Sequence, residues 1–224
     1  MSRLNKFIFN IFSSFNIHNE TDQLSNEDIQ CTFTDFKDNQ IISCIDYFPN
    51  VSKGQCRVYS YPFTIRCYKS ITNKFSGGLF ECVRQVSLFD ERPFEHEFLF
   101  RISQSFPFME KLTLINDKPQ SNKQNRKVKN DGQDLLIIEY PHLTYLNLNK
   151  AHHDYVEQFL VDMEICLPNN VCLIVSFEAL KMVTENFTRD TTRINCAKLT
   201  SLCLLGSYKI TKHIKNYFPQ VTSF

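Results

Sequence analysis

The chain has 224 residues, and 25 lysines and arginines nearly balance 24 aspartates and glutamates, so its formal net charge is +1. This length suffices for one domain with a sizeable core, and near neutrality excludes a global field that would attract nucleic acid or a membrane surface. Phenylalanine contributes 21 residues and tryptophan is absent, a composition that fits aromatic core packing rather than a cofactor site.

Residues 1–50 are predicted to form an N-terminal helical segment. The apolar stretch 7–12 follows Arg3 and Lys6, as in a signal peptide, but it lacks a long apolar run and a small-residue cleavage site. It is also too short to span a bilayer. We therefore interpret it as an amphipathic helix or as the remnant of a preceding module.

From residue 51 onward the chain repeats a phrase: an apolar residue and a proline precede an apolar anchor, and apolar residues follow it by three and five positions. The phrase is clearest at 106–114 and 140–148, and 167–175 carries it with Asn170 at the anchor. The anchors lie at 83, 109, 143, 170, 199 and 221, and 27 residues before the first of them Cys56 is in register. Most steps fall within or near the period of about 20–29 residues of leucine-rich repeats.

Each phrase predicts a short strand, because alternate apolar residues present one face of a strand to a core. The intervals predict helices with an apolar stripe, at 65–75, 94–106, 154–167, 177–187 and 210–217. The predicted fold class is α/β, an irregular leucine-rich-repeat-like solenoid of short parallel strands alternating with helices, over residues 51–224. A polar insertion at 117–134 interrupts the repeats, and the last repeat is expected to be truncated at Phe224.

The repeats are irregular in their polar positions. A regular leucine-rich repeat carries an asparagine a few positions after each strand, and only Asn116 and Asn149 are candidates for it here. The curvature of the solenoid is therefore expected to vary from repeat to repeat.

The nine cysteines do not resemble a disulfide framework. Their number is odd, none forms a C-x-x-C pair, and several occupy predicted strands or helices as small apolar residues. This usage favours a reducing compartment, so we expect the protein in the cytosol or the nucleus.

The sequence contains no constellation that predicts catalysis. It lacks a phosphate-binding loop, a nucleophile elbow and a zinc-protease motif. The nearest approach to a metal cluster is His152-His153-Asp154. Adjacent histidines in a helix point about 100° apart, so we interpret this triplet as a solvated helix start with Asp154 as its cap. We therefore predict no enzymatic activity, no cofactor and no bound metal.

The polar stretch 117–134 carries five basic residues against three aspartates. Such a stretch can contact phosphates or act as a nuclear signal, and this gives an alternative hypothesis of a nucleic-acid-binding module. It lacks the interleaved aromatic residues that favour single-strand binding. A solvated insertion between two repeats is the preferred interpretation.

Several phrases within residues 24–224 resemble a known family. They are FEHEF (94–98), QSFPFMEKL (104–112), KNDGQD (129–134), YPHLTYL (140–146), LPNNV (167–171) and TRINCAK (192–198). They are similar to a large, lineage-expanded family of invertebrate F-box-type proteins with degenerate leucine-rich-like repeats. The resemblance implies an N-terminal F-box that docks a cullin-ligase adaptor, followed by repeats that bind a target protein.

The chain departs from this family at its N-terminus. No Leu-Pro-x-Glu phrase, which opens an F-box, precedes the repeats, and residues 3–7 resemble only the tail of that module. We therefore expect a fragment that holds the target-binding half, with adaptor binding dependent on whether this remnant suffices.

The resulting hypothesis is a non-enzymatic protein-interaction module, the target-recognition repeats of an F-box-like ubiquitin-ligase substrate receptor. Polar residues between the apolar anchors of a strand face solvent, and these are the candidates for contacting the unknown target. They are Arg84, Gln85, Ser87, Glu110, Lys111, Thr113, Thr144, Tyr145, Asn147, Thr200, Ser201 and Cys203.

Overall fold

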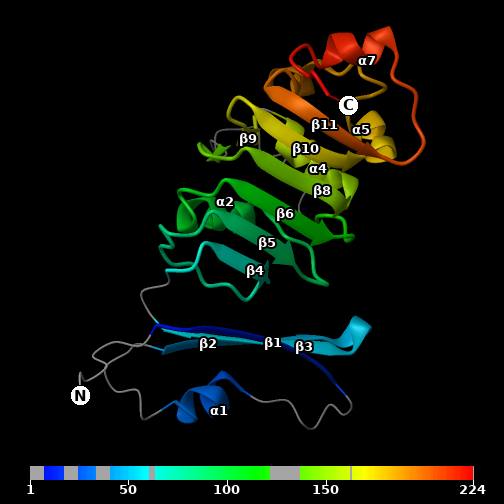
Figure 1. Cartoon of the computed structure of the whole chain (residues 1–224). Helices are drawn as coiled ribbons and strands as arrows, with labels where there is room; N and C mark the ends of the chain where they lie inside the picture. Colours follow the sequence, from blue (N-terminus) through cyan, green and yellow to red (C-terminus); the bar gives the residue numbers. More distant parts are fainter. Residues whose placement is uncertain are drawn as a thin grey trace, which may run out of the picture. The chain divides into compact units, whose positions relative to one another are not determined.

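The computed structural model describes residues 8–17, 25–33, 41–60, 64–121, 137–161 and 163–223. The chain divides into two compact units, residues 1–65 and residues 66–224. Figure 1 labels the helices and strands of both units, and each unit is described by itself.

The first unit is a three-stranded antiparallel sheet with one short helix. Its strands β1 (Asn10–Asn16), β2 (Ile41–Phe48) and β3 (Lys53–Ser60) lie in the order β1-β3-β2. The 3₁₀ turn Pro49–Val51 joins β2 to β3. The helix α1 (Asn26–Cys31) contributes Ile29 to a small core with Ile45 and Val58.

This unit differs from the helical segment predicted for residues 1–50. The apolar run predicted as an amphipathic helix continues into β1, which pairs with β3 along its whole length, from Asn10 opposite Tyr59 to Asn16 opposite Lys53. Cys56 lies in β3, an antiparallel strand, and not in a parallel strand of the repeat. The division of the chain falls after residue 65 rather than after residue 50. Residues 3–7, which resemble an F-box tail, lie outside the described residues.

The second unit is a mixed α/β fold built on a six-stranded parallel sheet (Figure 1). The strands lie in the order β11-β10-β8-β6-β5-β4, so each strand pairs with the next strand of this sheet along the chain. Their bounds are β4 (Cys67–Ile71), β5 (Gln85–Phe89), β6 (Lys111–Asn116), β8 (Tyr145–Ala151), β10 (Val171–Ser176) and β11 (Leu199–Leu205). The five strands predicted after the anchors at 83, 109, 143, 170 and 199 correspond to β5, β6, β8, β10 and β11.

Helices follow most of these strands and cover one face of the sheet (Figure 1). They are α2 (His96–Ser105), α4 (His153–Leu160), α5 (Phe177–Val183), α6 (Arg193–Cys196) and α7 (Lys212–Tyr217), with a 3₁₀ turn at Asp190–Thr192. Two short strands, β7 (Ile138–Glu139) and β9 (Ile165–Cys166), form a separate parallel pair. The buried face of the large sheet consists of alternate apolar side chains: Val86, Leu88, Leu112, Leu114, Leu146, Leu148, Leu173, Val175, Leu202 and Leu204.

The recurring phrase forms a recurring turn in front of the strands. In four copies the amide of the anchor donates a hydrogen bond to the carbonyl three residues earlier, at 3.1–3.2 Å: Val83 to Phe80, Met109 to Phe106, Leu143 to Tyr140 and Val221 to Phe218. Proline fills the second turn position in three copies, at 107, 141 and 219, because its fixed φ suits that position. The copy at 167–175 departs from this pattern, since the amide of Asn170 donates to the carbonyl of Lys198 instead.

The helix predicted at 65–75 is wrong, because these residues form the edge strand β4 instead. Tyr68 pairs with Val86 and Ile71 with Leu88, and the register shifts between the two pairs. Ser70 lies between them at φ 54°. This irregularity lets residues three apart bury their side chains on one face, which imitates helical spacing.

The other four predicted helices overlap α2, α4, α5 and α7, although the observed helices are shorter. The end of the helix predicted at 154–167 is wrong, because α4 ends at Leu160 and Ile165–Cys166 form the strand β9. Asn116 is buried at the end of β6, where its Nδ2 donates to the carbonyl of Arg92 at 2.7 Å and its Oδ1 accepts from the amide of Lys118 at 2.9 Å. The Asn149 side chain is only half-buried. In the described ranges, no helix has the length and apolar character required to cross a membrane.

Candidate functional site

The face of the large sheet that does not carry the leucine core presents two rows of side chains. Strand register aligns Gln85, Lys111, Tyr145, Cys172 and Ser201 in the first row. The second row holds Ser87, Thr113, Asn147, Ile174 and Cys203. We call these ten residues the outer rows. Since neighbouring strands lie about 4.8 Å apart, each row forms a continuous line of side chains across five strands.

Eight of the twelve predicted partner-binding residues belong to the outer rows. The other four, Arg84, Glu110, Thr144 and Thr200, come directly before or at the start of a strand. None of the twelve is buried. The structure therefore places the whole predicted set on one sheet face or along its adjoining edge.

A shallow hollow of about 400 Å³ opens in the outer rows above β4, β5, β6 and β8. It is lined by Cys67, Lys69, Gln85, Val86, Ser87, Lys111, Thr113 and Tyr145. The charged residues among them are two lysines, and the Lys111 Nζ lies 6.0 Å from the centre of the Tyr145 ring. The hollow thus combines positive charge with hydroxyl and amide groups.

Five of these lining residues were predicted and three were missed. Cys67 and Lys69 were missed because the sequence around them predicts a helix rather than β4. Val86 is a core position that also borders the hollow. An alternation test fails at 67–71, because the register shift between Tyr68 and Ile71 breaks the period of two.

A polar and aromatic ridge runs along the edge of the sheet where the strands begin. The Arg84 guanidinium lies 5.2 Å from the centre of the Phe108 ring, and that ring lies 5.4 Å from His142. Arg84 Nε is also 3.6 Å from a carboxylate oxygen of Glu110. Phe108 is 40% exposed although it is a large apolar residue.

Sequence reasoning missed Phe108 and His142. Both occupy the third position of a recurring turn, between the proline and the anchor. A side chain at this position points away from the core, because the flanking first and fourth residues bury theirs. The repeated phrase could therefore have predicted that Phe108 and His142 are exposed.

Burial shifts the pKa of one thiol and two hydroxyl groups in the second unit. Burial raises the pKa of the Cys196 thiol to about 12, and it raises the pKa of the Tyr140 and Tyr155 hydroxyls above their ordinary range. These groups stay protonated at neutral pH. The Tyr155 hydroxyl accepts a hydrogen bond from the amide of Phe94 at 3.0 Å, which connects α4 to the residues before α2.

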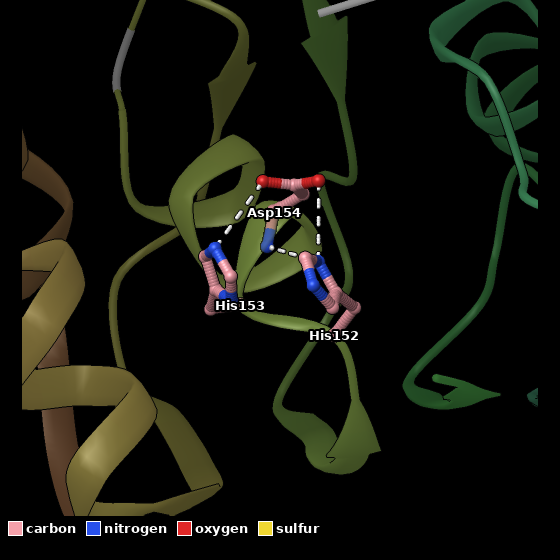
Figure 2. Close-up of side chains that lie close together, drawn as sticks. All are labelled: His152, His153 and Asp154. Carbon is pink, nitrogen blue, oxygen red and sulfur yellow. Dashed lines mark hydrogen bonds and ion pairs between the residues drawn. The ribbon is translucent and has the colours of Figure 1, made fainter. Parts of the chain in front are cut away.

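His152, His153 and Asp154 lie close together at the start of α4 (Figure 2). His152 Nδ1 is 3.1 Å from Asp154 Oδ2, and His153 Nε2 is 3.7 Å from Asp154 Oδ1. The ring centres of the two histidines are 3.9 Å apart. The prediction that the two histidine side chains point about 100° apart is wrong. It assumes that both belong to the helix, whereas His152 is the N-cap and lies outside it. The cap is His152, and not Asp154 as predicted.

A buried polar network holds Asp154 in place. Asp154 Oδ2 accepts a hydrogen bond from the amide of Gln120 at 3.0 Å. The Gln120 side chain donates to Gln158 Oε1 at 2.7 Å and to the carbonyl of Phe94 at 2.8 Å. Gln158 in turn contacts His96 Nδ1 at 2.9 Å. The network joins α2, α4 and the chain after β6.

The basic insertion predicted at 117–134 is described only as far as residue 121, so its larger part lies outside the described residues. Comparisons with protein-family models, with curated proteins and with solved structures find no match to this chain.

Proposed function

We propose that this chain is a non-enzymatic protein-interaction module and that it recognises its partner through the outer rows and the hollow within them. The observation that carries this proposal is the alignment of eight predicted contact residues in two rows across one sheet. Binding residues on strands are held more precisely than residues on loops, and these strands are fixed by a leucine core on their other face.

The chemistry of the hollow favours an acidic segment of the partner. Lys69 and Lys111 supply positive charge, while Gln85, Ser87 and Thr113 supply hydrogen-bonding groups around them. A carboxylate side chain can pair with the lysines and also accept hydrogen bonds from the amide and hydroxyl groups around them. The Arg84–Phe108 pair at the edge of the sheet offers an adjoining contact of the kind that is enriched in binding hot spots.

Within this proposal the second unit is one arc of an irregular leucine-rich-repeat-like solenoid. The recurring turns and the sequential strand order support it. Ser223 forms a parallel bridge with Ser201, so the phrase at 218–223 begins to pair with β11 as a further repeat would. An F-box-like ubiquitin-ligase substrate receptor in the cytosol or nucleus is the biological setting that we propose for such an arc.

The test is affinity capture from cell extract with quantitative mass spectrometry. The full chain is compared with a variant in which Gln85, Lys111, Tyr145 and Asn147 are replaced by alanine. A matched control replaces two exposed residues of α5, Glu178→Ala and Lys181→Ala. We expect a partner that the control retains and the outer-row variant loses, because only the latter lacks the contact groups. Equal capture by all three proteins would sink the proposal.

The same experiment separates the receptor hypothesis from an isolated recognition module. Recovery of the cullin-ligase adaptor along with the target supports a working receptor whose N-terminal remnant suffices. Recovery of the target without the adaptor supports recognition alone. The alternative of nucleic-acid binding through residues 117–134 predicts RNA or DNA binding that weakens steeply with added salt and disappears when residues 122–134 are deleted.

A further inference from the structure

The triplet at the start of α4 has the spacing of a metal site. One ligand atom from each of His152, His153 and Asp154 lies within 4.8 Å of the other two. Ligands about 2.0–2.1 Å from a tetrahedral zinc ion are separated from one another by roughly 3.4 Å. His152 Nδ1 lies 3.1 Å from Asp154 Oδ2 and His153 Nε2 lies 3.7 Å from Asp154 Oδ1, so each ring nitrogen is near that spacing from one oxygen of the same carboxylate.

The contacts of His152 fit either a proton or a metal ion between the ring and the carboxylate. The amide of Asp154 donates a hydrogen bond to His152 Nδ1 at 3.3 Å, which uses the lone pair of a neutral ring nitrogen. The same nitrogen lies 3.1 Å from Asp154 Oδ2, which is an acceptor as well. Two acceptor atoms at this distance repel each other unless a proton or a metal ion lies between them.

Burial fixes the carboxylate and leaves the imidazole rings accessible. The Asp154 side chain is 8% exposed, whereas the side chains of His152 and His153 are 23% and 39% exposed. The amide of Gln120 donates to Asp154 Oδ2, and outer hydrogen bonds of this kind orient a metal-ligating carboxylate. Figure 2 shows both rings on the same side of Asp154, one toward each oxygen.

We propose that His152, His153 and Asp154 bind a divalent transition-metal ion. Two imidazole nitrogens and one carboxylate oxygen suit zinc, cobalt, nickel or copper better than calcium or magnesium, which prefer oxygen ligands. Three protein ligands leave a fourth position for water or for a side chain of a partner. Because Asp154 also accepts a hydrogen bond from Gln120, the ion stabilises the connection between α4 and the start of the 117–134 insertion.

The test titrates the metal-free full chain with zinc by calorimetry and with cobalt by visible absorption. We expect one ion per chain and a cobalt spectrum with nitrogen and oxygen ligands but no thiolate charge-transfer band. His153→Ala removes the most exposed ligand and is expected to weaken binding about tenfold or more. The matched control His213→Ala removes an exposed histidine of α7 and leaves the affinity unchanged.

A second measurement excludes a simple folding effect. Zinc should raise the melting temperature of the wild-type chain and of His213→Ala but not of His153→Ala, while all three melt alike in chelator. Absence of saturable binding overturns the proposal, and so does unchanged affinity in His153→Ala. A thiolate band that thiol alkylation removes overturns it as well, because the ion would then lie on cysteines.

Discussion

The two units stabilise their sheets in different ways. In the first unit three antiparallel strands bury a small cluster around Ile29, Ile45 and Val58. In the second unit six parallel strands share a continuous layer of leucine and valine side chains, many of them 0% exposed. In the second unit one continuous core therefore extends across all neighbouring strands of the sheet. The three-stranded sheet of the first unit depends on a few contacts.

The largest effect is expected from a cavity in the layered core. Leu146 is 0% exposed in β8, where its neighbours in register are Leu112 and Leu173. Leu146→Ala should lower the free energy of unfolding of the second unit by about 3–5 kcal/mol. Hydrogen exchange with mass spectrometry in increasing urea checks this. Equal loss of protection in β1 and β3 would contradict separate stability of the units.

The matching change in the first unit should cost less. Ile45 is 4% exposed, but most of its neighbours are only partly buried, so the site can relax around a smaller side chain. We expect Ile45→Ala to lower the free energy of unfolding of the first unit by about 2 kcal/mol. The same exchange experiment measures it, with the protection of β6 and β8 as internal control. A loss as large as that of Leu146→Ala would remove the difference between the units.

A smaller effect distinguishes the two asparagine candidates of the repeat. Asn116 is buried and its side chain makes two hydrogen bonds to the backbone. Asn116→Ala leaves these backbone groups without that partner and should destabilise the second unit by about 1–3 kcal/mol. Asn149→Ala, at a half-buried position, should cost under about 0.5 kcal/mol. Chemical denaturation of both variants compares them, and equal costs would contradict the predicted difference between the two asparagines.

A further effect depends on pH. The Cys196 thiol has its pKa raised from 9.0 to about 12 by burial. Above pH 9 the unfolded chain therefore ionises this thiol while the folded unit keeps it protonated, so the stability of the second unit should fall as pH rises. Comparison of wild type with Cys196→Ala in denaturation curves between pH 7 and pH 10.5 isolates the contribution. An identical pH dependence in both proteins would exclude it.

The sequence predicts the second unit better than the first for a physical reason. A phrase repeated at 106–114 and 140–148 combines the sequence preference of a turn with the alternation of a strand, and both predict the same structure. β1 shows neither, since Ile11 and Phe12 are adjacent and both exposed. Only its long-range pairing with β3 makes it a strand, and pairing partners that are 37 to 49 residues apart leave no local signal.

The residues of the candidate site were predicted where the sequence pattern is regular and missed where it is irregular. Gln85, Lys111 and Tyr145 were found because alternation on a regular strand separates outward from inward residues. Lys69 was missed where a register shift disturbs that alternation. The closeness of His152 to His153 was missed because a cap residue does not follow helical spacing.

Site-specific photocrosslinking tests the central claim most directly. A photoreactive phenylalanine derivative replaces Tyr145 in the outer rows or, as matched control, Met182 on α5, which is 59% exposed. The account predicts a discrete protein adduct from position 145 and none from position 182 after irradiation in cell extract. An adduct from position 182 alone, or none from position 145, would show that the outer face of the sheet is not the recognition surface.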